Sequence, residues 1–229
     1  MTKRRRRWTG VLIAALAVLA VTGWGWAVWL RFTTTPLLTV AAKESIALNP
    51  VFSESDSAVV QALERRNSTK AADFTDQPVD ADRLQALFWA ATGKNRDGTG
   101  FVVPLAMHAE PYVSVYGADE DGVRQFDWRQ NGFISVSGAD VRAALATQDF
   151  ARQAPHLMLF VINTADIPSK NTDWGYVAVG AMTQNVYLLA DDLNVQARFI
   201  AGIDPDAARA ELGLTDGQVP VGAIVLASK

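Results

Sequence analysis

An uninterrupted apolar run near the start of the chain constrains the fold more than any other feature. Residues 10–30 form a stretch of 21 residues without a charged side chain, and Arg31 ends it. A helix of about 20 apolar residues matches the hydrocarbon core of a bilayer. Trp24, Trp26 and Trp29 gather toward the far end of the run, where indole rings favour the membrane interface. We therefore expect one transmembrane helix at residues 10–30.

Basic residues before this run predict its orientation. Lys3 and the four arginines at 4–7 lie within residues 1–9, which the positive-inside rule places in the cytoplasm. A linker at residues 31–49 and a domain at residues 50–229 would then lie outside the cytoplasm. A cleaved signal peptide and twin-arginine export are the alternatives. An uncleaved anchor in the cell membrane is favoured, because a signal peptide has an apolar core of only about 7–15 residues.

Composition limits the chemistry that the remaining domain can perform. The chain has 229 residues and no cysteine, so disulfides and thiolate chemistry are excluded. Residues 1–31 hold six of the 21 basic side chains and no acid, which leaves 15 basic and 24 acidic residues and a net charge of −9. An acidic domain argues against nucleic-acid binding. With His108 and His156 as the only histidines, the sequence offers neither a metal-binding cluster nor a hydrolase motif.

Hydrophobic periodicity predicts a mixture of helices and strands. The apolar run at residues 157–162 is typical of a central buried strand. Asp121 and Gly122 separate two predicted strands as a hairpin turn, and residues 94–100 are expected to form a loop. This pattern predicts an α+β fold in which helices flank a mixed sheet. The expected helices are 53–66, 80–92, 139–147, 174–193 and 204–212, and the expected strands are 112–116, 123–126, 157–162, 197–200 and 219–226.

The stretch at residues 64–70 combines Arg66, Ser68 and Lys70 where an amphipathic helix is predicted to end. Arginine offers a rigid fork of donors for phosphate, lysine adds a mobile charge, and serine adds a hydroxyl. These residues can form an anion site. The alternative is an ordinary basic helix C-terminus, because cations favour that end of the helix dipole. The alternation favours side chains on one side of an extended segment, with Arg65 as a solvated neighbour.

Other candidates lie downstream. Gln184 and Asn185 interrupt an apolar helical pattern, and a buried amide costs about 1–3 kcal/mol unless it is bonded. These amides either contact a ligand or bond across a helix–helix interface. Ala201 and Gly202 follow a predicted strand, where small residues let a flat ligand approach the backbone.

Several segments in order resemble the nitroreductase family. Residues 66–71 look like its phosphate motif, Arg-x-Ser-x-Lys/Arg, and residues 104–112 look like its Pro-Ser-x-x-Asn-x-Gln-Pro-Trp motif. Residues 87–96 resemble Leu-Leu-Trp-Ala-Ala-x-Gly-x-Asn-Arg of the SagB-like branch. Further segments at residues 148–155, 180–188 and 220–222 fit the same family, and the resemblance extends from residue 46 to residue 229.

This resemblance implies an FMN-binding homodimer with the flavin at the dimer interface. It implies that Arg66 binds the phosphate, that Ser68 and Lys70 reach the ribityl chain and the ring edge, and that Lys229 joins the phosphate site. His108 takes the place of an asparagine that bonds the ring, and Ala201 and Gly202 present backbone N–H groups near the flavin N5. The implied cofactor-binding set is Arg66, Ser68, Lys70, Pro104, Leu105, His108, Glu110, Gln184, Asn185, Ala201, Gly202 and Lys229.

Departures from the family motifs leave two functions open. Leu105, His108 and Glu110 replace the family's Ser, Asn and Gln. Glu110 would place a negative charge near the flavin, which disfavours an anionic reduced ring. We expect a membrane-anchored, extracytoplasmic FMN-dependent oxidoreductase that acts on a small molecule, with its electron donor undetermined. The alternative is a flavin-free binding or scaffolding module that keeps the fold.

Overall fold

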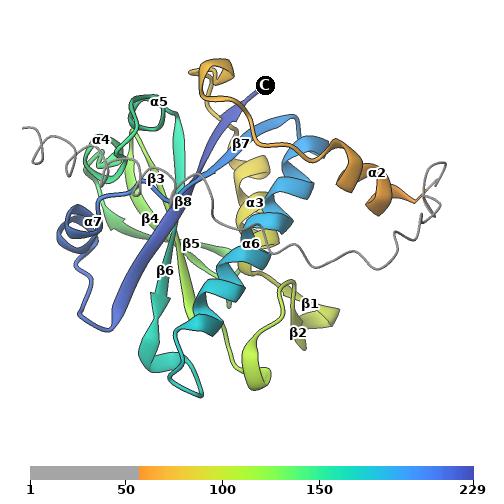
Figure 1. The fold of residues 1–229 in the computed structure, drawn as a ribbon, viewed down its shortest axis with the longest axis vertical. Helices are drawn as coiled ribbons and strands as arrows, with labels where there is room; N and C mark the ends of the chain where they lie inside the picture. Colours follow the sequence, from red (N-terminus) through yellow and green to blue (C-terminus); the bar gives the residue numbers. More distant parts are fainter. Residues whose placement is uncertain (1–56) are drawn as a thin grey trace, which may run out of the picture. The chain divides into compact units, whose positions relative to one another are not determined.

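The predicted α+β fold is confirmed by a computed structural model, which describes residues 57–229 (Figure 1). In this part of the chain, a six-stranded sheet with the order β5-β4-β3-β6-β8-β7 lies between two groups of helices. The strands are β3 (Val113–Asp119), β4 (Gly122–Asp127), β5 (Gly132–Ser137), β6 (His156–Asn163), β7 (Val195–Ile200) and β8 (Gln218–Ser228). The helices α3 (Ala81–Thr92) and α6 (Asp173–Asp192) cover one face, and α4 (Arg142–Leu145), α5 (Asp149–Arg152) and α7 (Pro205–Leu212) cover the other.

The predicted segments 1–9, 10–30 and 31–49 lie outside the described residues, as do positions 53–56 of the first predicted helix. The described part of that helix is α2 (Ala58–Arg65). Within residues 57–229, no helix has both the length and the apolar character needed to cross a membrane. The predicted transmembrane helix therefore stays a prediction from sequence.

Every pairing within the six-stranded sheet of the described residues is antiparallel, so the expected mixed sheet is wrong for these strands. The connection through α6 does return β7 in the same direction as β6. However, β8 pairs with both of them and lies between the two. A strand inserted between two parallel neighbours makes each pairing antiparallel, and sequence patterns do not report this order.

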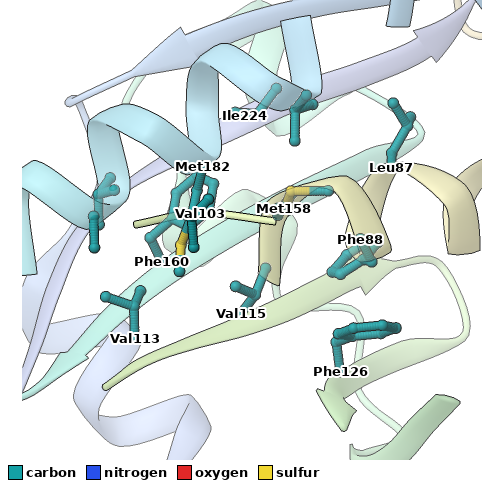
Figure 2. Packing of buried hydrophobic residues seen from close by; sticks show 14 of the residues in the cluster. Leu87, Phe88, Val103, Val113, Val115, Phe126, Met158, Phe160, Met182 and Ile224 are labelled. Atoms are coloured by element: carbon teal, nitrogen blue, oxygen red, sulfur yellow. The ribbon is translucent and has the colours of Figure 1, made fainter. Parts of the chain in front are cut away.

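The predicted central strand is confirmed as β6, which is buried along residues 157–162. Alternate side chains of a strand face opposite sides of the sheet. Met158 and Phe160 accordingly join the core beneath α3 and α6, where Figure 2 shows them beside Met182. Leu157 and Leu159 enter the second core, beneath α4 and α7. One apolar run thus supplies both cores and holds the two layers of helices on the sheet.

Capping residues fix the ends of two predicted helices, as their sequences indicate. The Asp80 carboxylate accepts the N–H of Arg83 at 2.9 Å and starts α3, and Gly93 follows its last residue. The Asp204 carboxylate caps α7 at two backbone N–H groups. Gly213 ends α7 with a φ of +61°, a left-handed conformation that glycine adopts without strain.

Three local predictions need correction. The helix expected at 139–147 is limited to α4, because the chain turns after Leu145 to form a bridge between Ala146 and Ile203. The loop expected at 94–100 contains a small hairpin of β1 (Lys94–Asn95) and β2 (Gly100–Phe101). The strand β5 was not predicted from sequence, although Asn131–Gly132 before the apolar Phe133, Ile134 and Val136 is a usable hairpin signal.

His156, the first residue of the central strand β6, connects this strand to the segment before α3. Its imidazole Nε2 accepts the backbone N–H of Val79 at 3.0 Å, and its Nδ1 lies 3.6 Å from the Asp119 carboxylate. Asp119 is 6% exposed and also binds the Arg124 guanidinium. Burial lowers the pKa of His156 below its ordinary value of 6.5, although Asp119 partly opposes the shift. The folded protein therefore prefers the neutral imidazole.

This preference predicts a pH-dependent stability. As the pH falls through 6.5, the unfolded chain takes up a proton that the folded chain does not, so the free energy of unfolding decreases. The decrease ends when the pH reaches the lowered pKa of the folded state. Urea denaturation between about pH 5 and 8 measures this slope. His156→Gln keeps an acceptor but does not titrate, so we expect a flatter slope. A slope equal to that of the native chain contradicts the prediction, and the exposed His108→Gln serves as the control.

Candidate functional site

An extended segment at residues 66–70 runs from α2 toward β7. The backbone N–H of Thr69 donates to the Ala197 carbonyl at 3.0 Å, and Arg198 donates to the Thr69 carbonyl at 3.2 Å. These contacts fix the main chain of the segment at Thr69. The segment then continues into a short 3-10 helix, Ala71–Asp73. The extended geometry predicted for this stretch is therefore observed.

Tyr187 of α6 gathers two of the predicted side chains of this segment. The Ser68 hydroxyl lies 3.0 Å from the Tyr187 hydroxyl. The Arg66 guanidinium carbon lies 5.4 Å from the centre of the Tyr187 ring, which is cation–π distance. Arg66 and Ser68 therefore share one side, as predicted for these two residues. Lys70 is exposed, and its place on the same side stays a prediction.

Ion pairing distinguishes the two neighbouring arginines, Arg65 and Arg66. Arg65 is exposed, as expected of a solvated neighbour, and it also donates to Asp191 at 2.9 Å and to Asp192 at 2.8 Å. Within residues 57–229, neither Arg66 nor Lys70 forms an ion pair with a carboxylate. Arg66 and Lys70 are thus the cations of this segment that remain available to an anion.

Lys229 lies nearby but is already paired. Its ammonium group donates to Asp191 at 2.7 Å, and Asp191 is shared with Arg65. The pKa of Asp191 lies below its ordinary value, first because Lys229 donates a hydrogen bond to it and next because Arg65 does. The implied contact of Lys229 with a phosphate therefore requires Lys229 to leave Asp191, and this role stays a prediction.

The predicted ring-side residues lie in the loop between β2 and β3. Leu105 is half-buried and packs against the core beneath α6, whereas His108 is exposed with a φ of +59°. Pro104, in the same loop, is exposed. The Glu110 carboxylate accepts from the Arg129 guanidinium at 2.7 Å, so its negative charge is compensated by a neighbouring cation.

The predicted site has two parts, the segment at residues 66–70 and the ring-side loop between β2 and β3. They contact different ends of α6. Tyr112, just after the ring-side loop, accepts the N–H of Ala106 at 3.2 Å and donates to the Trp174 carbonyl at 3.4 Å. Tyr187, which contacts Arg66 and Ser68, lies about 20 Å further along the helix axis at 1.5 Å per residue. A ligand that uses both parts must extend along α6 or receive one part from a second copy of the chain.

The remaining predicted residues separate into structural and accessible groups. The Asn185 amide donates to the carbonyls of Ala90 and Val102 at 3.1 Å each, which is the helix–helix alternative considered from the sequence. Gln184 is half-buried and forms no side-chain hydrogen bond within residues 57–229. Gln184 rather than Asn185 therefore remains available to a ligand.

The Ala201–Gly202 backbone is partly accessible. Ala201 is exposed, and the Gly202 carbonyl accepts from the backbone and the hydroxyl of Thr147 at 3.0 and 2.9 Å. A Cβ at Gly202 would lie 2.6 Å from the Thr147 hydroxyl oxygen. Packing against Thr147 is thus sufficient reason for glycine here, and the implied flavin contact of Gly202 stays a prediction.

Two of the cavities in the described part of the chain are large and lie away from residues 66–70. One, of about 420 Å³, lies where β3 and β4 separate, and Glu110 is the predicted residue that lines it. The other, of about 580 Å³, lies beside Asp119 and His156 and contains none of the predicted residues. Within the described part of the chain, no group of three His, Asp or Glu side chains is arranged to hold a metal ion.

The sequence did not single out Tyr187 as a site residue, because its helical spacing is that of an ordinary core residue.

Comparison with known proteins gives a consistent family assignment. A sequence model described as the nitroreductase family matches residues 63–228. A solved Ralstonia eutropha JMP134 protein assigned to the nitroreductases is 26% identical, with a TM-score of 0.68, covering 80% of this chain and 88% of that one. No curated protein sequence matches the chain.

Two more distant solved structures share the fold. A Desulfovibrio desulfuricans protein assigned to the nitroreductases, solved in complex with FMN, is 20% identical with a TM-score of 0.55, covering 76% of this chain and 87% of that one. A chain of the E. coli microcin synthetase McbBCD complex is 14% identical with a TM-score of 0.61, covering 86% of this chain and 83% of that one. At these identities, the similarity supports the fold alone.

Proposed function

The chain belongs to the nitroreductase family. We propose that it is an oxidoreductase that uses FMN, and that it is membrane-anchored and extracytoplasmic. One observation carries the cofactor proposal. In the segment that matches the family's phosphate motif, Arg66 and Lys70 are free of carboxylate partners among residues 57–229, whereas Arg65 is bound to Asp191 and Asp192. The cations at the motif positions are therefore the ones open to an anion. The Desulfovibrio protein, which shares the fold, was solved with FMN, and we propose the same cofactor here.

The residues present fit FMN best on the phosphate side. Arg66 can bind phosphate oxygens through its planar fork, while Ser68 and Lys70 add a hydroxyl and an ammonium donor. On the ring side, the exposed His108 and the accessible Ala201 backbone remain candidates. Bound FMN would supply hydride or electron transfer, and the protein would orient it and exclude water.

The negative charge of Glu110 is compensated by Arg129, which makes this position more compatible with flavin binding. The sequence places a carboxylate where the family has a neutral amide, but Arg129 lies 2.7 Å from it. Both side chains are exposed, so the pair adds little stability. Its importance here is that the nearby cation reduces the repulsion that Glu110 would exert on a reduced flavin.

We also propose that the protein is a homodimer that uses the exposed face of α6. Tyr176 and Val177 are 51% and 55% exposed on this helix, although most large apolar side chains of the described domain are buried. Gly180, on the same helix, is exposed, and a Cβ there would meet open space. A second copy on this face would cover the apolar side chains. It would also bring its own ring-side loop toward the first copy, which addresses the separation of about 20 Å along α6.

The membrane proposal rests on residues 1–31, with their basic start and their 21-residue apolar run. An extracytoplasmic domain would be separated from the cytoplasmic nicotinamide pool. A membrane quinone or a protein is therefore the electron donor that fits this location, and the proposed substrate is a small molecule.

Uptake of FMN by the purified full-length chain tests the cofactor proposal. We expect a yellow protein that binds about one FMN per chain and loses its flavin absorbance on reduction. Absorbance spectroscopy and quenching of FMN fluorescence during titration measure both properties. A colourless protein that takes up no added FMN contradicts the proposal.

The same preparation separates the oxidoreductase from the alternative, a flavin-free binding or scaffolding module. Packing of the half-buried Leu105 against the core and use of the Asn185 amide between secondary-structure elements favour that alternative, because they occupy two of the implied cofactor contacts. An FMN-loaded protein that is reduced and then reoxidised by an electron acceptor rules the alternative out.

A further inference from the structure

Tyr187 is a buried tyrosine that joins three parts of the chain near the proposed phosphate site. It is 7% exposed and belongs to the core beneath α6. Its hydroxyl oxygen accepts the backbone N–H of Phe199 in β7 at 2.6 Å and lies 3.0 Å from the Ser68 hydroxyl. Its ring also lies beneath the Arg66 guanidinium. The residue is therefore fixed at both its ring and its hydroxyl.

The hydrogens of the two hydroxyls give the central argument. Ser68 and Tyr187 carry one hydroxyl hydrogen each, and one of the two is used in the bond between them. The Phe199 N–H is a donor, so it provides no acceptor for the other hydrogen. Within residues 57–229, no further acceptor contacts either hydroxyl. Whichever way the shared bond points, one O–H remains to donate to an external acceptor.

We infer that Tyr187 is a binding-site residue outside the Arg-x-Ser-x-Lys motif, and that it acts on the cofactor's phosphate end through Ser68 and Arg66. The inference rests on the proposed FMN function. When Tyr187 donates to Ser68, Phe199, Tyr187 and Ser68 form a hydrogen-bond chain that ends in the exposed Ser68 hydroxyl, and donors in such a chain strengthen one another. Phosphate oxygens are acceptors that suit this donor.

The ring of Tyr187 adds a second contribution, because it limits where the Arg66 side chain can lie. An arginine side chain loses conformational freedom when it binds an anion. Contact with the face of a buried aromatic ring restricts that freedom before binding. The hydroxyl and the ring thus position two of the motif side chains, and the motif by itself does not reveal this.

A purely structural role is the competing explanation, since Tyr187 also links α6 to β7. Tyr187→Phe and Ser68→Ala distinguish the two, because Tyr187→Phe keeps the ring and Ser68 is exposed. In the full-length chain, we expect each substitution to weaken FMN binding by about 5- to 10-fold. The double variant should lose no more than either single variant, because both act through one hydrogen-bond chain.

Titration of FMN against the apoprotein measures these affinities, and the absorbance spectrum of bound FMN at saturation reports on the ring. We expect that spectrum to stay unchanged, since the altered hydroxyls lie at the phosphate end. A structural role would instead change the spectrum or give losses that multiply in the double variant. Tyr116→Phe, in the core beneath α4 and α7, is the matched control and should keep the native affinity.

Three results overturn the inference: native FMN affinity in either single variant, multiplied losses in the double variant, or an altered spectrum. If Tyr187→Phe fails to fold, the exposed Ser68→Ala still decides, because native affinity in that variant is sufficient to reject the hydrogen-bond chain. Failure of the proposed function looks different, since the native chain itself would then bind no FMN.

Discussion

Replacing Phe160 by alanine is expected to lower the free energy of unfolding by about 3–5 kcal/mol. Phe160 is 0% exposed on the central strand β6, beside Met182 and Met158 in the core beneath α3 and α6 (Figure 2). Removing the ring loses its transfer free energy and leaves a cavity. The surrounding sheet and helices can close that cavity only in part, because the site lies between two interior strand pairings. Chemical denaturation followed by tryptophan fluorescence measures the change.

Ile134→Ala in β5 is the control for this substitution. Ile134 is 53% exposed on the edge strand, so most of its surface is already in water. We expect a change within about 0.5 kcal/mol, as for most surface positions. Comparable losses at both positions would contradict the assignment of Phe160 to the core.

Arg66→Ala is expected to weaken FMN binding by about 1.5–3 kcal/mol, or roughly 10- to 150-fold in Kd. The substitution removes a bidentate charged donor from the segment that matches the phosphate motif. It also removes the cation that stacks on Tyr187. Titration of the apoprotein with FMN, followed by fluorescence quenching, gives the two dissociation constants.

Arg65→Ala provides a matched control one residue away. It removes the same charge from the same segment, but the Arg65 guanidinium is bound to Asp191 and Asp192. We therefore expect near-native FMN affinity. Equal losses in the two variants would mean that the phosphate senses only the general positive charge of this region, or that it binds elsewhere.

Local patterns were sufficient for most of the fold. Asp80 and Gly213 mark helix ends because capping involves only neighbouring residues, and the apolar run of β6 marks burial on both faces. The order of the strands in the sheet could not be predicted from such local patterns. The position of β8 between β6 and β7 depends on contacts between segments far apart in the sequence. The extended form of residues 66–70 was also predicted, because alternation is a local property.

The family, the α+β class and the match of Arg66, Ser68 and Lys70 to a phosphate motif are all readable from local sequence. Which cations are already paired depends on the fold, since ion pairs such as Arg65 with Asp191 join residues more than 120 positions apart. The fold likewise decides that the Asn185 amide bonds to Ala90 and Val102. Hydrogen bonds and ion pairs act over a few ångströms in space. Their partners therefore become known only when the fold brings distant segments together.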